Sequence, residues 1–120
     1  MFEFSLERLS DCTLLCVDGD VLDDVDADLL TEALVFVQPD DHLVLDLTHV
    51  NQLSSRGTDV IHDTLIRRAV IAETVVVSSQ EPVSMQLVLH DVDRVCPIVR
   101  DIADARAILE KPWTRRRQPR

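Results

Sequence analysis

The chain has 120 residues, of which 46% are hydrophobic and 28% are charged, as expected for one globular domain. No apolar run approaches the ~20 residues of a membrane-spanning helix, so we expect no membrane insertion. The net charge is −10, but residues 111–120 hold five of the twelve basic residues and no acid, so residues 1–110 carry 22 acids against 7 bases, or −15. A body of this charge disfavours binding to nucleic acid or to anionic lipid.

The first third of the chain predicts two strands and a helix. Residues 2–7 alternate apolar and polar side chains, as in a half-buried strand, and residues 12–18 predict a second strand that ends at Gly19. The acidic run 20–28 leads into a helix that Pro39 ends. One face of this helix is expected to carry Val25, Leu29, Leu30, Ala33, Leu34 and Val37.

The middle of the chain predicts two buried strands with a helix between them. Residues 42–47 and 75–77 are nearly all apolar, as expected for strands that are covered on both faces. Residues 55–69 have the three-and-four spacing of a helix, whose inner face is expected to carry Gly57, Val60, Ile61, Leu65 and Arg68.

The last third predicts two helices around a short strand. Pro82 begins a helix that breaks at residues 91–92, and residues 98–99 form the strand. Asp101 caps a final helix that Pro112 ends. The inner face of this helix is expected to carry Ile102, Ala105, Ile108 and Leu109.

These elements predict one α/β domain over residues 1–110, followed by a basic, disordered tail over residues 111–120. The order is two strands and a helix, then three strand–helix pairs. Such alternation builds a mixed, mostly parallel sheet, here of about five strands with four helices.

The N-terminus lacks the basic and then apolar layout of a signal peptide, so we expect a cytoplasmic protein. The cysteines Cys12, Cys16 and Cys96 are odd in number and form no Cys-x-x-Cys pair. Cys12 and Cys16 are four residues apart in an expected strand, a distance of ~13 Å that is too long for a disulfide. We predict buried free thiols.

The run 46–57 carries the strongest functional signal. A hydrophobic strand ends at Asp46, a polar loop follows, and Ser54 and Ser55 stand where a helix begins. A helix start carries unpaired N–H groups and about half a positive charge. This place favours a serine that caps the helix, which either serine can do, or a phosphoryl group attached to a serine.

The same run is similar to the signature of the STAS domain family, whose best-known members are bacterial anti-sigma factor antagonists. That signature is a strand, Asp or Asn-Leu-Ser, a short loop, and Asp-Ser-Ser/Thr-Gly at a helix start. Here it reads Asp46-Leu47-Thr48 and then Ser54-Ser55-Arg56-Gly57. Three further stretches resemble the family pattern in the same order: Gly19-Asp20, Val83 with Leu87, and Val92-Asp93.

The resemblance implies a STAS-like domain in which Ser55 is the serine that a partner kinase phosphorylates, and Gly57 lets the helix start pack closely. The chain departs from the signature at Ser54, where the family has Asp, and at Arg56, where it has Ser or Thr. The alternative is a plain helix start with no phosphorylation.

A partner-binding face is expected around this helix start: Asp23, Asp24, Ser54, Ser55, Arg56 and Asp59. The acids before the first helix would steer a basic partner surface. The alternative is that they only complement the helix dipole and keep the chain soluble.

We expect neither an enzyme nor a cofactor or metal site. His62 lies seven residues after Ser55, about two helical turns or ~10 Å, too far to serve as its base. The acidic run 18–28 lacks the glycine and glutamate of an EF-hand loop, and the histidines are scattered singly.

Three functions are therefore weighed. The first is an antagonist that binds an anti-sigma factor, a serine kinase of the histidine-kinase-like ATPase type, and is switched off at Ser55 until a phosphatase restores it. The second is a STAS scaffold or subunit of a signalling or lipid-transport complex, without phosphorylation. The third is a nucleotide or anion sensor at the 48–57 loop.

Overall fold

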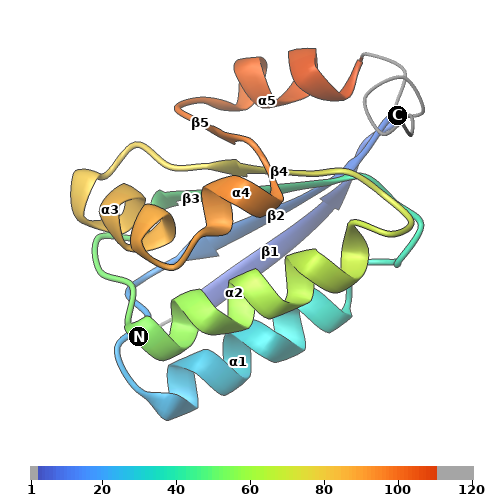
Figure 1. The fold of residues 1–120 in the computed structure, drawn as a ribbon. Helices are drawn as coiled ribbons and strands as arrows, with labels where there is room; N and C mark the ends of the chain where they lie inside the picture. Colours follow the sequence, from blue (N-terminus) through green and yellow to red (C-terminus); the bar gives the residue numbers. More distant parts are fainter. Residues whose placement is uncertain (1–2, 111–120) are drawn as a thin grey trace.

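A five-stranded sheet in the order β1-β2-β3-β4-β5 runs through the computed structural model, which describes residues 3–110 (Figure 1). β1 is antiparallel to β2, and the other neighbouring pairs are parallel, so the predicted mixed, mostly parallel sheet is confirmed. Leu45 in the centre pairs with Leu15 on one side and with Val76 on the other. The strands are β1 (Glu3–Arg8), β2 (Thr13–Asp18), β3 (Leu43–His49), β4 (Thr74–Val77) and β5 (Ile98–Val99).

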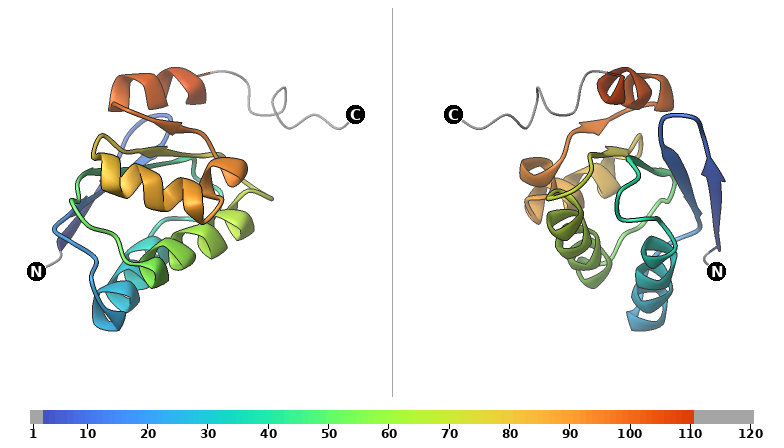
Figure 2. Two further views of the ribbon diagram at one scale, coloured as in Figure 1. Left: turned by 60° about the vertical axis from the view of Figure 1, so that its left-hand side comes forward. Right: turned by 90° about the vertical axis from the view of Figure 1, so that its right-hand side faces the viewer.

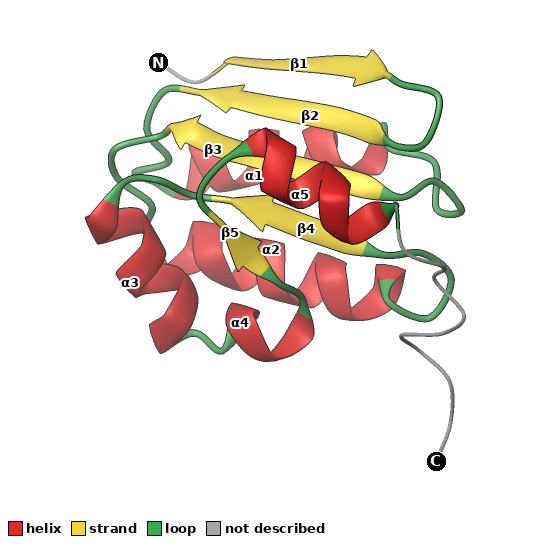
Figure 3. Ribbon diagram, turned by 90° about the horizontal axis from the view of Figure 1, so that it is seen from above, coloured by secondary structure: helices red, strands yellow, loops and turns green. Residues whose placement is uncertain are grey.

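The helices cover both faces of this sheet. α1 and α2 lie on one face and α5 on the other, while α3 and α4 lie beside the β4 and β5 edge (Figures 2 and 3). Their bounds are α1 (Asp24–Val35), α2 (Ser55–Arg68), α3 (Glu81–Leu89), α4 (Val92–Val95) and α5 (Ile102–Leu109). The predicted end of α5 at Pro112 and the predicted tail lie outside the described residues.

The predicted number of four helices is wrong, because the break after α3 contains a further helix, α4. Asp91 adopts a left-handed conformation with φ of 63°, which ends α3 as a glycine would. The chain then makes one more turn, closed by a bond from the N–H of Cys96 to the carbonyl of Val92. Val92 is fully buried, so packing holds this turn in place.

Two apolar layers hold the sheet, one on each face. Leu43, Leu45 and Leu47 of β3 point into the layer under α1 and α2, and Val44 points into the layer under α5. The second layer includes Ala105 and Leu109 of α5. The prediction that β3 is covered on both faces is therefore confirmed.

The predicted inner face of α1 is partly wrong. Val25 is 67% exposed and Leu29 is 36% exposed, whereas Ala27 and Leu30 are fully buried. The buried stripe runs through residues 27, 30 and 34, because the helix packs this side into the layer on the sheet, and Val25 and Leu29 then face solvent. The helix also ends at Val35, before Pro39.

Candidate functional site

The loops that follow β2 and β3 lie at the same edge of the sheet, because both strands are parallel. They are joined by a bridge between Val21 and Leu53, in which the N–H of Ser54 donates to the carbonyl of Val21 at 2.8 Å. The Asp20 carboxylate accepts from the N–H groups of Asn51 and Gln52 at 2.9 and 3.1 Å. These bonds hold the starts of α1 and α2 side by side.

Ser54 and Ser55 have different roles at the start of α2. Ser54 is the N-cap: its Oγ accepts from the N–H of Gly57 at 3.0 Å, and its carbonyl accepts from the hydroxyl of Thr58 at 2.8 Å. Ser55 is the first helical residue and is exposed. Among residues 3–110, no group hydrogen-bonds its side-chain hydroxyl. The Ser55 hydroxyl is thus accessible and is not needed to cap the helix.

Arg56 and Asp24 come together across the two helix starts. Arg56 Nε lies 3.5 Å from Asp24 Oδ1, and the two side chains are 61% and 82% exposed. This contact joins the acidic corner of α1 to the first turn of α2, as the predicted face requires. Water and salt can reach both groups, so we expect the pair to contribute little to stability.

Asp23 has a capping role within α1. Its Oδ1 accepts from the N–H of Asp26 at 2.9 Å, and Asp26 Oδ2 accepts from the N–H of Leu22 at 2.9 Å. This reciprocal arrangement resembles a capping box. For Asp23 the geometry therefore agrees with the alternative of a helix-capping acid, whereas Asp24 faces Arg56.

Asp59 lies one turn further along α2 and contacts α3. Its Oδ1 is 2.8 Å from Nδ1 of His90, and the Gln86 side-chain amide donates to the carbonyl of Leu53 at 3.2 Å. Sequence reasoning missed His90 and Gln86, because each lies more than 30 residues from its partner and no local pattern signals the contact. α3 is therefore attached to the candidate site.

Asp46, which begins the signature, is buried beneath the site. Its carboxylate accepts from the N–H of Thr48 at 3.0 Å and from the thiol of Cys16 at 3.5 Å. Burial, with the charge of Asp46 as a second cause, raises the pKa of Cys16 to about 11, so this thiol stays protonated as a donor. Cys12, Cys16 and Cys96 are all free; Cys16 is half-buried, and the other two are buried as predicted.

The backbone N–H groups of the 48–57 loop are mostly occupied by the chain itself. The Asp46 carboxylate accepts from the N–H of Thr48, and the Asp20 carboxylate accepts from the N–H groups of two loop residues. The Ser54 hydroxyl accepts from the N–H of Gly57. An anion that used the N–H groups of Thr48, Asn51, Gln52 or Gly57 would have to displace these side chains. His62, the nearest histidine along α2, pairs with Asp63 at 3.5 Å.

Over the described range 3–110, no group of three or more His, Cys, Asp or Glu side chains is arranged to hold a metal ion. Within the same residues, no helix is long and apolar enough to cross a bilayer.

Comparison with known proteins identifies the fold. No protein-family model and no curated protein sequence matches the chain. Among solved structures, an anti-sigma factor antagonist from Mycobacterium paratuberculosis superposes with a TM-score of 0.80 at 22% identity, over 92% of this chain and 96% of that one.

Two further structures agree with this result. A STAS-domain anti-sigma factor antagonist from Planctomyces limnophilus has a TM-score of 0.67 at 14% identity, over 88% of this chain and 96% of that one. The antagonist SpoIIAA in its unphosphorylated form has a TM-score of 0.58 at 16% identity, over 98% and 100%. The chain has the STAS fold of these antagonists, as the sequence resemblance implied.

Proposed function

We propose that this chain is an anti-sigma factor antagonist that binds an anti-sigma factor kinase and is released when the kinase phosphorylates Ser55. The observation that carries the proposal is the exposed, unused hydroxyl of Ser55 at the start of α2, where Ser54 already provides the cap. Proteins of the same fold are antagonists, and one of them is described in its unphosphorylated form.

The geometry supports a charge switch at this position. A phosphoryl group on Ser55 would lie at the positive end of α2, which favours its formation. It would also add ~1.5–2 negative charges to a surface that already holds Asp24 and Asp59. Arg56, now paired with Asp24, is close enough in sequence to turn toward the phosphoryl group and leave Asp24 unpaired. A partner fitted to the unmodified surface would then meet a different charge pattern.

The proposed docking face combines Ser54, Ser55, Arg56 and Asp59 with the Asp23–Asp24 corner. In the proposed function, the chain works by binding a partner rather than by catalysis. It works in the cytoplasm, where ATP and sigma factors are found, and a phosphatase resets it.

A scaffold that is not phosphorylated is the second candidate. The observation in its favour is that Ser54 and Arg56 replace the usual signature residues: Ser54 caps the helix, and Arg56 lies in an exposed pair with Asp24. The sensor at the 48–57 loop has less support, since side chains of this chain occupy most of the N–H groups that an anion would need.

Intact-mass spectrometry tests the proposal. The protein is mixed with ATP and each candidate anti-sigma kinase from the same genome, beside Ser55→Ala and Ser54→Ala variants. We expect one added phosphate on the wild type and on Ser54→Ala, and none on Ser55→Ala. Stable complexes on a sizing column without any phosphate would instead support the scaffold. If the protein gains no phosphate and forms no complex with any of the kinases, both candidate functions are contradicted.

A further inference from the structure

An exposed apolar ridge runs along the C-terminal half of α1, at the far end of the helix from the candidate site. Val35 is 76% exposed and Phe36 is 66% exposed. Large apolar side chains grouped on a surface in this way mark interaction sites more often than single exposed residues do. We use the name α1 ridge for Thr31 and Val35, which lie one turn apart on the same face.

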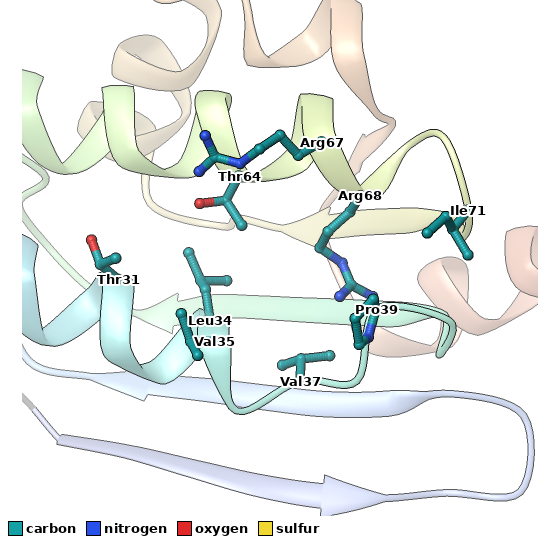
Figure 4. A pocket seen from close by; sticks show the side chains of 9 residues that line it. All are labelled: Thr31, Leu34, Val35, Val37, Pro39, Thr64, Arg67, Arg68 and Ile71. Atoms are coloured by element: carbon teal, nitrogen blue, oxygen red, sulfur yellow. The ribbon is translucent and has the colours of Figure 1, made fainter.

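Hollows flank the α1 ridge on both sides. One, of about 310 Å³, lies between α1 and α2 and has Leu34 and Ile71 among its apolar walls (Figure 4). The other, of about 340 Å³, lies on the opposite flank and is lined by Glu32 and Phe36 together with the ridge residues. The ridge therefore stands between two spaces, each large enough to accept a side chain.

One charged side chain borders each hollow. Arg67 borders the first and extends along α2 toward Thr64 (Figure 4). Glu32 borders the second. In residues 3–110, neither of these two side chains has an ion-pair or hydrogen-bond partner. The neighbouring Arg68 is different: it is 7% exposed and donates to the carbonyls of Gln38 and Asp41.

We propose that this surface binds a second copy of the chain around a two-fold axis that runs parallel to α1 along its ridge. Such an axis places Val35 against Val35 of the partner. The flank that carries Glu32 and Phe36 in one copy then faces the flank that carries the α1–α2 hollow and Arg67 in the other copy. The exposed side of the Phe36 ring, whose other side packs on Phe4, enters the α1–α2 hollow of the other copy, and Glu32 of each copy faces Arg67 of the other.

The surface favours a second copy as its occupant because it is complementary to itself. The Phe36 ring, which packs on Phe4 of β1 with ring centroids 6.1 Å apart and stays 66% exposed, lies on one flank together with an acid. A hollow and a base lie on the other flank. Two symmetric ion pairs and two buried phenyl rings form at once, whereas an unrelated partner would need the same pattern by chance. The contact is carried by Val35, Phe36, Glu32 and Arg67, none of which belongs to the proposed docking face, so this inference does not depend on the proposed function.

Sedimentation equilibrium tests this dimer over concentrations from about 1 μM to about 1 mM, a range that covers ordinary weak homodimers. We expect the wild type to move from the mass of one chain to twice that mass. Glu32→Arg and Arg67→Glu each bring like charges together twice per dimer, and we expect each to weaken association about tenfold. The double reversal, Glu32→Arg with Arg67→Glu, restores opposite charges and is expected to recover most of the loss.

Two further variants separate this surface from general stickiness. Val35→Asp buries a carboxylate at the axis and is expected to abolish the dimer, while Val88→Asp on the exposed face of α3 leaves it unchanged. Both side chains are more than half exposed, so circular dichroism should show intact folds. A wild type that stays monomeric throughout, a dimer that survives Val35→Asp, or a double reversal no better than the single ones would each overturn the proposal.

Discussion

Gly57, in the first turn of α2, lies directly against Val21: a β-carbon built on Gly57 falls 2.7 Å from Val21 Cγ1. Val21 is fully buried and is bridged to Leu53, so it has no room to move aside. The close approach sets the start of α2 against the β2–α1 loop. This contact between Gly57 and Val21 therefore brings Ser55 next to the acidic corner of α1.

Gly57→Ala is therefore expected to destabilise the fold, although alanine is normally the better helix residue. The ~1 kcal/mol gained in helix propensity is outweighed by overpacking, which leaves a net loss of about 1–2 kcal/mol. Urea unfolding measures this loss. In a Val21→Ala background the added methyl has space, and the loss should vanish; an equal loss in both backgrounds would contradict the contact.

The two adjacent serines should separate stability from function. Ser54→Ala removes the cap on the N–H of Gly57 and is expected to cost ~1 kcal/mol. Ser55→Ala removes a hydroxyl without a partner in the described structure and should change stability by less than about 0.5 kcal/mol. Thermal unfolding of the two variants checks the order, and equal losses would show that the cap is assigned to the wrong serine.

A charged mimic at position 55 should act in opposite directions on folding and on binding. Ser55→Asp places an acid in the first turn of α2, which is expected to raise stability by about 0.3–1 kcal/mol. If our functional proposal holds, the same change should weaken binding of the anti-sigma factor at least about tenfold, or ~1.4 kcal/mol. The control is Ser55→Asn, because asparagine has the size of aspartate but carries no charge. Unchanged affinity for both variants would argue against a charge switch.

Arg68 is expected to be the most sensitive charged residue of α2. Its buried guanidinium joins the end of α2 to the carbonyls of Gln38 and Asp41, and burial lowers its pKa. Arg68→Ala leaves two partly buried carbonyls without their donor and removes a buried side chain, and it should cost about 1–3 kcal/mol. Arg68→Lys should recover only part of this loss, because one ammonium cannot reproduce the planar fork.

Arg67 is the matched control for that experiment. It precedes Arg68 in the chain, has no hydrogen-bond or ion-pair partner within residues 3–110, and its replacement by alanine should stay within about 0.5 kcal/mol. Urea unfolding at low protein concentration keeps self-association out of the comparison. Equal losses for Arg67→Ala and Arg68→Ala would contradict the structural role of Arg68.

Alkaline pH should destabilise the protein through its thiols. Desolvation raises the pKa of Cys16 to about 11 and of Cys96 to about 12, from 9.0 in an unfolded chain. Above pH 9 the unfolded chain loses these protons first, so the native state binds more protons and stability falls as pH rises to about 11. The chain has no tyrosine, which leaves few other groups to titrate there.

The measurement is urea unfolding between pH 8 and about 11, compared with a Cys16→Ala variant. The variant removes one of the shifted groups and should show a shallower fall. Below pH 9 the wild-type thiols stay protonated and should react slowly with alkylating reagents. Rapid alkylation of the folded protein at pH 8 would contradict the raised pKa values.

The sequence predicted the elements well wherever local chemistry decides them. α2 begins at Ser55, as predicted, because a serine at either position 54 or 55 caps a helix that starts within one residue of this place, and Asp101 caps α5 as predicted. The continuous apolar runs of β3 and β4 indicated burial on both faces, and both strands are buried. From such elements, and from the resemblance of four short stretches, the STAS fold could be predicted.

The pairings within the candidate site could not be predicted in the same way. Which serine caps the helix, the partner of Arg56, and the link from Asp59 to His90 each depend on side-chain positions after the helices pack. The inner face of α1 was misjudged because its apolar residues surround much of the helix, so periodicity alone did not fix its rotation.

Local periodicity and capping thus determined which segments of this chain are strands and helices, since these depend on residues within a few positions of each other. The tertiary structure alone decided that α4 forms, that α1 turns Val35 and Phe36 to solvent, and that two helix starts share one surface. Those outcomes depend on contacts between residues some 30 positions apart, whose free energy appears only when the sheet brings them together.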